Sequence, residues 1–179
     1  MRQVALLRGI NVGRAKRVSM ADLRALVSDL GLRDASTLLN SGNVVFTCPK
    51  GTPRESAVRI EKALKGRLGI TSRVIALSAG ELADVIAGNP LLSIADNPSR
   101  LLVAVPADPS DCSKLSQLEK QDWGRDAFAV GPRAAYLWCF DGIIASKLNT
   151  TVNKLLGEDV TSRNWATILK LQAMLDGEG

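Results

Sequence analysis

The 179-residue chain contains no histidine, and this absence excludes several kinds of catalytic site. Histidine is the usual general base near neutral pH and the commonest protein ligand of transition metals. A Ser-His-Asp triad, a Cys-His pair and a histidine-bound metal are therefore excluded. Asp108 and Asp111 form a close acidic pair at a predicted helix start, where helix capping explains them. We expect no metal site and no bound cofactor.

Cysteines are few, and long apolar runs are missing. Cys48, Cys112 and Cys139 are odd in number, widely spaced and free of any C-x-x-C pair, which argues against a disulfide framework and a zinc knuckle. No apolar run approaches the roughly 18 residues that a membrane span needs, and Arg8 interrupts the N-terminal apolar stretch. We therefore expect a cytoplasmic protein with reduced thiols and no membrane association.

Positive charge is concentrated in the first half of the chain. Residues 1–90 hold 14 basic and 7 acidic side chains, whereas residues 91–179 hold 9 and 11. A basic half can attract phosphates or nucleic acid, although a charged surface that maintains solubility is the commoner explanation. The charge distribution alone does not decide between the two.

Apolar periodicity and turn residues predict the order β-α-β-β-α-β in the first half. The predicted strands are residues 3–7, 35–39, 43–47 and 73–77, with a tight hairpin at residues 40–43. Helices begin at Ser19, with Asp22 three residues later, and at Thr52, with Glu55 three residues later. This order is that of a ferredoxin-like, or α-β plait, unit.

A similar order recurs in the second half. Strands are predicted at residues 100–105, 127–130 and 134–140 with a short fourth strand at 159–161, and helices at Asp108-Pro109, around residues 148–156 and after Trp165. We therefore predict an α+β fold with two ferredoxin-like subdomains, the second carrying an extra C-terminal helix. The first subdomain spans residues 1–78, the second residues 100–179, and a helix with its connection at residues 79–99 links them.

Five short motifs, taken together, are specific to one bacterial family. They are residues 5–13, residues 41–46, Asn89-Pro90, Ser146-Lys147-Leu148 and Arg163-Asn164-Trp165. On these motifs the sequence resembles the family called domain of unknown function sixteen ninety-seven, over nearly the whole chain. The resemblance implies two α-β plait subdomains and assigns no reaction, cofactor or partner. Arg14 departs from the family pattern, which has a glycine there, and makes the loop stiffer and more basic.

The predicted topology places a candidate anion site at one edge of the first subdomain. The end of the first strand and the hairpin between the second and third strands lie at the same edge of a ferredoxin-like sheet. This edge gathers Arg8, Asn11, Arg14, Ser41 and Asn43, with Lys16 and Arg17 just beyond. Arginine and asparagine supply directed donors for an oxyanion or phosphate. Alternatively, the glycines serve turn geometry and the asparagines cap their own loops.

The same topology suggests a second polar edge in the second half. Lys147, Arg163 and Asn164 are its candidate ligand-binding residues. Helix capping by the nearby serines and core packing of Trp165 are the more ordinary interpretations. Tyr136, Trp138 and Phe140 alternate along one strand and could stack nucleobases, but packing within the protein is the favoured interpretation.

These observations favour a binding protein for an anionic ligand, either a phosphate-bearing small molecule or a nucleic acid. One alternative is a histidine-free phosphoryl or acyl transfer enzyme, in which arginines stabilise charge and Asp141 serves as base. Another is an interaction or assembly protein without site chemistry. The sequence identifies no protein partner.

Overall fold

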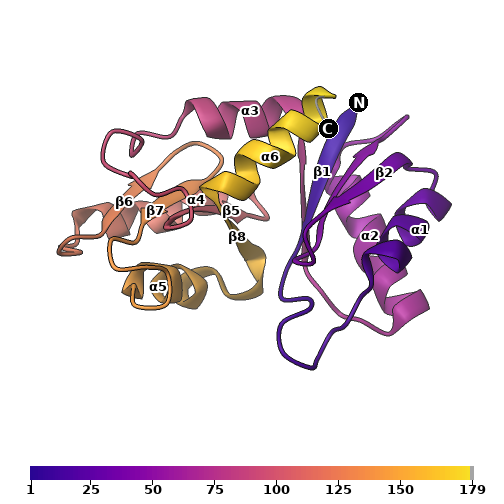
Figure 1. The fold of residues 1–179 in the computed structure, drawn as a ribbon, viewed down its shortest axis with the longest axis horizontal. Coiled ribbons are helices and arrows are strands. Elements are labelled where there is room, and N and C mark those ends of the chain that lie inside the picture. Colours follow the sequence, from indigo (N-terminus) through magenta and orange to yellow (C-terminus); the bar gives the residue numbers. More distant parts are fainter. Residues whose placement is uncertain (178–179) are drawn as a thin grey trace. The chain divides into compact units, whose positions relative to one another are not determined.

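The computed structural model describes residues 1–177, which divide into two compact units (Figure 1). The first unit comprises Met1–Leu82 and the C-terminal residues from Leu171 onward, and the second comprises Ala83–Lys170. Two helices, α3 (Ala79–Ala87) and α6 (Trp165–Asp176), each contain a boundary between the units. The C-terminal half of α6 thus groups with the first unit, and Arg2 there donates a hydrogen bond to the Met174 carbonyl at 2.7 Å.

The first unit contains a four-stranded antiparallel sheet covered by two helices. The sheet has the order β2-β3-β1-β4 and consists of β1 (Arg2–Leu7), β2 (Arg33–Leu38), β3 (Asn43–Thr47) and β4 (Val74–Ser78). Helices α1 (Met20–Asp29) and α2 (Pro53–Leu68) bury Leu23, Ile60 and Leu64 in a core shared with β1 and β3. This is the predicted β-α-β-β-α-β order.

The capping residues read from the sequence set the helix starts in the first unit. The Ser19 hydroxyl accepts from the Asp22 amide at 3.0 Å, and α1 begins one residue after it. At the start of α2, Thr52 and Glu55 form a reciprocal capping box, in which the Thr52 amide donates to the Glu55 carboxylate at 2.7 Å. Gly69, in the left-handed conformation at φ 65°, ends α2.

The second unit repeats this topology with the sheet order β6-β7-β5-β8. Its strands are β5 (Leu101–Pro106), β6 (Ala127–Val130), β7 (Ala135–Trp138) and β8 (Val160–Asn164). All neighbouring strands are antiparallel. The two sheets thus share one topology, which confirms the predicted α+β fold with two subdomains and is consistent with the ferredoxin-like arrangement.

Two elements of the second unit differ from their predicted form. The first helix is a short α4 (Cys112–Leu115) between two 3₁₀ turns, Pro109–Asp111 and Ser116–Lys120, instead of one regular helix. The last strand, β8, extends to Asn164, beyond the expected residues 159–161, because it pairs along β5 from Pro106 to Leu102. Helix α5 (Lys147–Leu156) packs Leu148 and Val152 into the core of this unit.

No helix within residues 1–177 is both long and apolar enough to cross a membrane.

Candidate functional site

The loop between β1 and α1, residues 8–18, is fixed by its own backbone and by one asparagine. Gly9 (φ 63°), Asn11 (φ 55°), Gly13 (φ 63°) and Lys16 (φ 51°) adopt left-handed conformations, which turn the chain back on itself. Asn11 donates from Nδ2 to the carbonyls of Val18 and Asn40, both at 2.8 Å, and its Oδ1 accepts from the Val18 amide at 2.9 Å. The loop is therefore held at both ends and fastened to the β2–β3 hairpin.

The hairpin residues predicted for the anion site are occupied within the hairpin. Asn43 is fully buried and donates to the Leu38 carbonyl at 2.9 Å and to the Ser41 hydroxyl at 3.0 Å. Asn11 and Asn43 thus close and join loops, as the alternative interpretation of the sequence describes for the asparagines. The predicted proximity of the two loops is present in the structure, with the Leu7 amide donating to the Gly42 carbonyl at 2.8 Å.

Arg8 sits at the root of the loop rather than on its exposed part. It is half-buried, its amide donates to the Arg73 carbonyl, and its carbonyl accepts from the Ser72 hydroxyl, both at 2.8 Å. Arg73 in turn lies 3.5 Å from the Glu61 carboxylate. These contacts join the β1–α1 loop to the connection between α2 and β4 through the backbone of Arg8.

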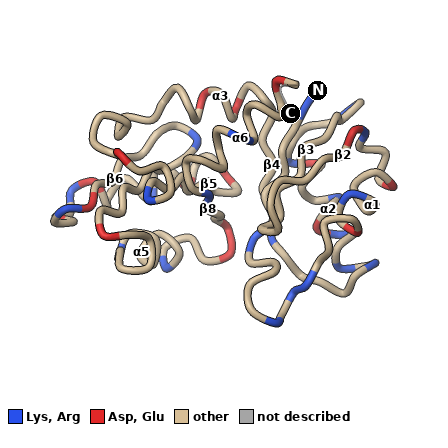
Figure 2. Tube along the Cα trace, in the orientation of Figure 1, with Lys and Arg blue, Asp and Glu red and all other residues tan. Residues whose placement is uncertain are grey.

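The exposed part of the loop carries three cations that no residue in the described part of the chain neutralises. Arg14, Lys16 and Arg17 are exposed, and their side chains make no ion pair or hydrogen bond with any residue from 1 to 177. Figure 2 shows basic positions along the loop that leads into α1. We call Arg14, Lys16 and Arg17 the cationic loop.

A pocket of 310 Å³ adjoins the cationic loop. Asn11, Arg17, Val18, Ser19 and Asn40 line it. It therefore lies between the fixed base of the loop, the hairpin and the first turn of α1. Arg17 lines this space together with Ser19 and Asn40, whereas both Nδ2 protons of Asn11 are already used within the protein. A guanidinium beside a hydroxyl can donate to an oxyanion.

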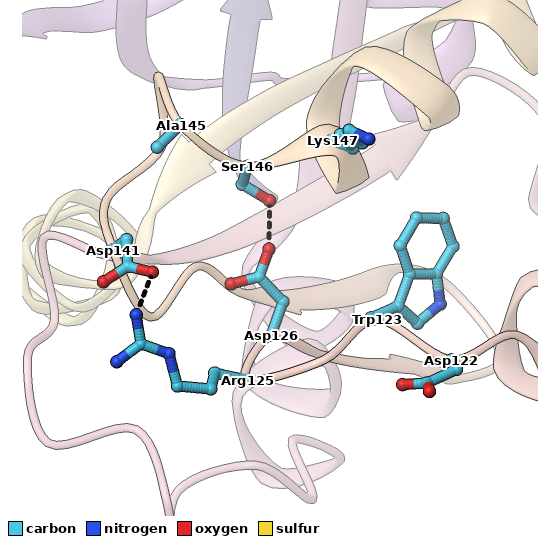
Figure 3. Close-up of a pocket in the computed structure, with 8 residues that line it drawn as sticks. All are labelled: Asp122, Trp123, Arg125, Asp126, Asp141, Ala145, Ser146 and Lys147. Carbon is cyan, nitrogen blue, oxygen red and sulfur yellow. Dashed lines mark hydrogen bonds and ion pairs between the residues drawn. The ribbon is translucent and has the colours of Figure 1, made fainter.

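The polar cluster of the second unit has a different composition from the predicted one. A pocket of 390 Å³ contains Lys147 from the predicted set, whereas Arg163 and Asn164 are not among the described residues that line it. Figure 3 shows its wall, which is formed by Asp122, Trp123, Arg125, Asp126, Asp141, Ala145, Ser146 and Lys147. With three carboxylates and two cations, this wall does not favour an anion.

Asp126 and Ser146 in that pocket have structural partners. Asp126 accepts from the Phe140 amide at 2.8 Å and from the Ser146 hydroxyl at 2.7 Å, and Ser146 caps α5 by accepting from the Leu148 amide at 3.2 Å. The pairing of Ala127 with Trp138 brings the residues just before β6 next to those just after β7. A sequence analysis that had derived this pairing register would have placed Asp126 and Asp141 close together.

Asp141, the general base of the enzyme alternative, forms an exposed ion pair. Its carboxylate lies 2.6 Å from the Arg125 guanidinium, and Arg125 also sits 4.3 Å above the ring of Phe140. The structure gives Asp141 no neighbouring nucleophile within hydrogen-bonding distance among the described contacts.

Arg163 and Asn164 lie on β8 and serve the fold locally. Arg163 donates to the Thr161 hydroxyl and the Ser162 carbonyl, both at 2.9 Å, and burial lowers the pKa of its guanidinium to about 10. Asn164 accepts from the Thr167 amide at 2.9 Å and so caps the first turn of α6. The motif Arg163-Asn164-Trp165 therefore ends a strand and starts a helix.

Of the three aromatic residues expected to pack within the protein, Tyr136 and Trp138 on β7 do so, whereas Phe140, beyond the end of β7, is 40% exposed. Tyr136 and Trp138 are buried, and the Tyr136 hydroxyl donates to the Val85 carbonyl at 2.6 Å. Burial raises the pKa of this phenol to about 12. These rings are not available to stack on a nucleobase.

The fold and the site define an α+β protein of two similar units, with an unneutralised cationic loop on the first. The chain belongs to the family described as "Protein of unknown function (DUF1697)", whose model matches residues 1–136. The motifs at residues 146–148 and 163–165 lie outside that match.

Among solved structures, the chain is similar to the conserved bacterial protein SP0830 from Streptococcus pneumoniae. The two share 22% sequence identity with a TM-score of 0.81, over 97% of this chain and 98% of that chain. At this identity the likeness shows the fold alone. No curated protein matches the sequence.

Proposed function

We propose that the first unit binds phosphate-bearing anions and that the cationic loop is its principal contact. The observation that carries this proposal is that Arg14, Lys16 and Arg17 are exposed together and have no partner among the described residues. Holding three like charges close together costs free energy, and an anionic ligand would remove that cost.

The rigid base of the loop supports the proposal. Asn11 makes three hydrogen bonds that fix the base of the loop before any ligand arrives, so little backbone conformational entropy is lost there on binding. The adjoining pocket offers Arg17 beside Ser19, and guanidinium groups form strong paired hydrogen bonds with phosphate oxygens. A binding protein of this kind, with reduced thiols, fits the cytoplasm, which is the location we propose.

The test is the triple substitution R14A/K16A/R17A, with binding of fluorescent ATP, inorganic tripolyphosphate and nucleic acid measured at low and high salt. The matched control is K120A/K154A/K170A, which removes three exposed charges from the second unit. We expect the loop variant to lose at least about tenfold in affinity, with an unchanged melting temperature, because each charged contact contributes about 0.5–1 kcal/mol.

The control variant should bind like the wild type, because it keeps the cationic loop although its net charge equals that of the loop variant. Equal losses in both variants would show that net charge alone drives binding and would contradict the proposal. The proposal would also be contradicted if the wild type bound none of these anions at low salt.

A further inference from the structure

The exposed face of α2 carries a stripe of cations in addition to the cationic loop. Arg54, Lys62 and Lys65 are exposed, and intervals of eight and three residues place them on one side of the helix with Val58 between them. Ile60 and Leu64 occupy the opposite, buried side. Within residues 1–177 these three cations have no hydrogen-bond or ion-pair partner for their side chains. We call Arg54, Lys62 and Lys65 the α2 stripe.

The other charged side chains of α2 are all used inside the unit. Arg59 donates to the Leu30 carbonyl, and Arg67 pairs with Asp29 at 2.7 Å. Glu55 closes the capping box, and Glu61 accepts from the Val74 amide at 2.7 Å. The helix therefore separates its charges into a structural set and the unneutralised α2 stripe.

The length of the α2 stripe favours an extended polyanion. From Arg54 to Lys65 the helix rises about 16 Å, at about 1.5 Å per residue. A nucleotide presents its phosphates at one point, whereas about 16 Å of duplex carries on the order of ten phosphate charges. A pocket of 740 Å³, lined in part by Lys50, Arg54 and Arg59, adjoins the N-terminal end of the stripe.

The α2 stripe leads toward the end of the unit that holds the cationic loop. Helix α2 ends at Leu68, and the connection that follows it contacts the root of the loop, where the Ser72 hydroxyl donates to the Arg8 carbonyl at 2.8 Å. Figure 2 shows basic positions on both α2 and the loop. Six unneutralised cations therefore lie on one helix and on the loop at its C-terminal end.

The first unit has no exposed ring on which a base could stack. Residues 1–82 contain one aromatic residue, Phe46, and residues 171–177 contain none. Phe46 is fully buried in the core. Proteins that bind single strands without sequence preference combine a basic groove with aromatic stacking, whereas duplex binding can rest on the phosphate backbone alone.

From these observations we infer that the first unit binds double-stranded nucleic acid through its phosphates, with contacts from both the cationic loop and the α2 stripe. The inference rests on the proposed anion binding by the loop and goes further in naming the class of ligand. Without base contacts, the binding has no sequence preference.

The test measures fluorescence anisotropy of the full chain with a 20-base-pair DNA duplex, an RNA duplex, a single strand of equal length and tripolyphosphate. We expect either duplex to bind more tightly than the single strand. The substitution K62A/K65A should weaken duplex binding and make the negative slope of log affinity against log salt shallower by about 2, because each phosphate contact contributes about −0.9 to that slope. The control K120A/K154A should leave that slope unchanged.

The outcomes separate this inference from the proposed function. If tripolyphosphate binds and R14A/K16A/R17A abolishes that binding, but the duplex binds no more tightly than the single strand, only the duplex inference is wrong. The same holds if K62A/K65A leaves the salt slope unchanged. Binding to phosphatidylglycerol vesicles without any duplex binding would also overturn it. If no phosphate-bearing probe binds, both proposals fail.

Discussion

At the scale of single residues, the close approach of the β1–α1 loop to the β2–β3 hairpin depends on one glycine. Gly42 has φ 82°, and a Cβ atom there would lie 2.8 Å from both the Leu7 Cβ and the Ile10 Cδ1. Only glycine satisfies both the left-handed backbone and the close approach of the two loops. Gly13 shares the left-handed backbone at φ 63° but has open space around it.

We therefore expect Gly42→Ala to lower the free energy of unfolding by at least about 2 kcal/mol, since backbone strain and overpacking add. Gly13→Ala is the matched control and should cost about 1 kcal/mol, from strain alone. Urea unfolding of both variants measures the difference. Equal losses would mean that the contact of Gly42 with Leu7 and Ile10 does not restrict the site.

At the scale of elements, one hydrogen bond connects strand β7 to helix α3 within the second unit. The buried Tyr136 hydroxyl donates to the Val85 carbonyl at 2.6 Å, and burial raises the pKa of the phenol to about 12. In the unfolded chain the phenol ionises near its ordinary pKa of about 10. The stabilisation from the neutral phenol is therefore complete below about pH 10 and is lost as the pH rises to about 12.

We expect Tyr136→Phe to lose about 1–2 kcal/mol of stability at pH 8, because the Val85 carbonyl stays buried without its donor. The gap between wild type and variant should then shrink as the pH rises from 10 to 12, since phenylalanine does not ionise. Unfolding in urea at pH 8, 10 and 11 follows this gap. Arg163, whose lowered pKa acts in the opposite direction, is present in both proteins and does not affect the difference. A gap that stays constant across this range would contradict the assignment.

At the scale of the whole molecule, all three thiols are enclosed by the fold. Cys48, Cys112 and Cys139 are free and buried, and burial raises the pKa of the Cys112 and Cys139 thiols. Fewer thiolates form at neutral pH when the pKa is raised, and the reagent also needs access to the sulfur.

We expect the native protein to react with a thiol reagent such as Ellman's reagent at least about a hundredfold more slowly than the denatured chain, with three thiols released in denaturant. The rate for the native protein should follow the free energy of opening, so denaturant below the unfolding transition should raise it. Rapid reaction of one thiol in the native state would show that its surroundings open locally.

Sequence patterns were sufficient for the order of the elements because that order depends on local chemistry. Ser19, Thr52 with Glu55, and the turn residues at positions 40–43 act through neighbours a few residues away, and the structure uses each of them as expected. The break of the helix around Cys112 was not predicted, because propensities do not distinguish a continuous helix from short turns that follow a strand closely. For the second polar edge we predicted Lys147, Arg163 and Asn164, whereas the pocket groups Lys147 with residues next to β6 and β7. The sequence did not reveal the register of β6 and β7, which brings those residues together.

The sequence by itself determined that the first half is basic and that the chain lacks the residues for histidine chemistry. Only the tertiary structure decided which cations are neutralised, because the partners lie far away along the chain. Arg59 reaches the Leu30 carbonyl and Arg67 reaches Asp29, whereas no residue from 1 to 177 forms a hydrogen bond or ion pair with the side chain of Arg14, Arg17 or Lys62. Charge is a property of composition, but whether a charge is available to a ligand depends on what the fold places beside it.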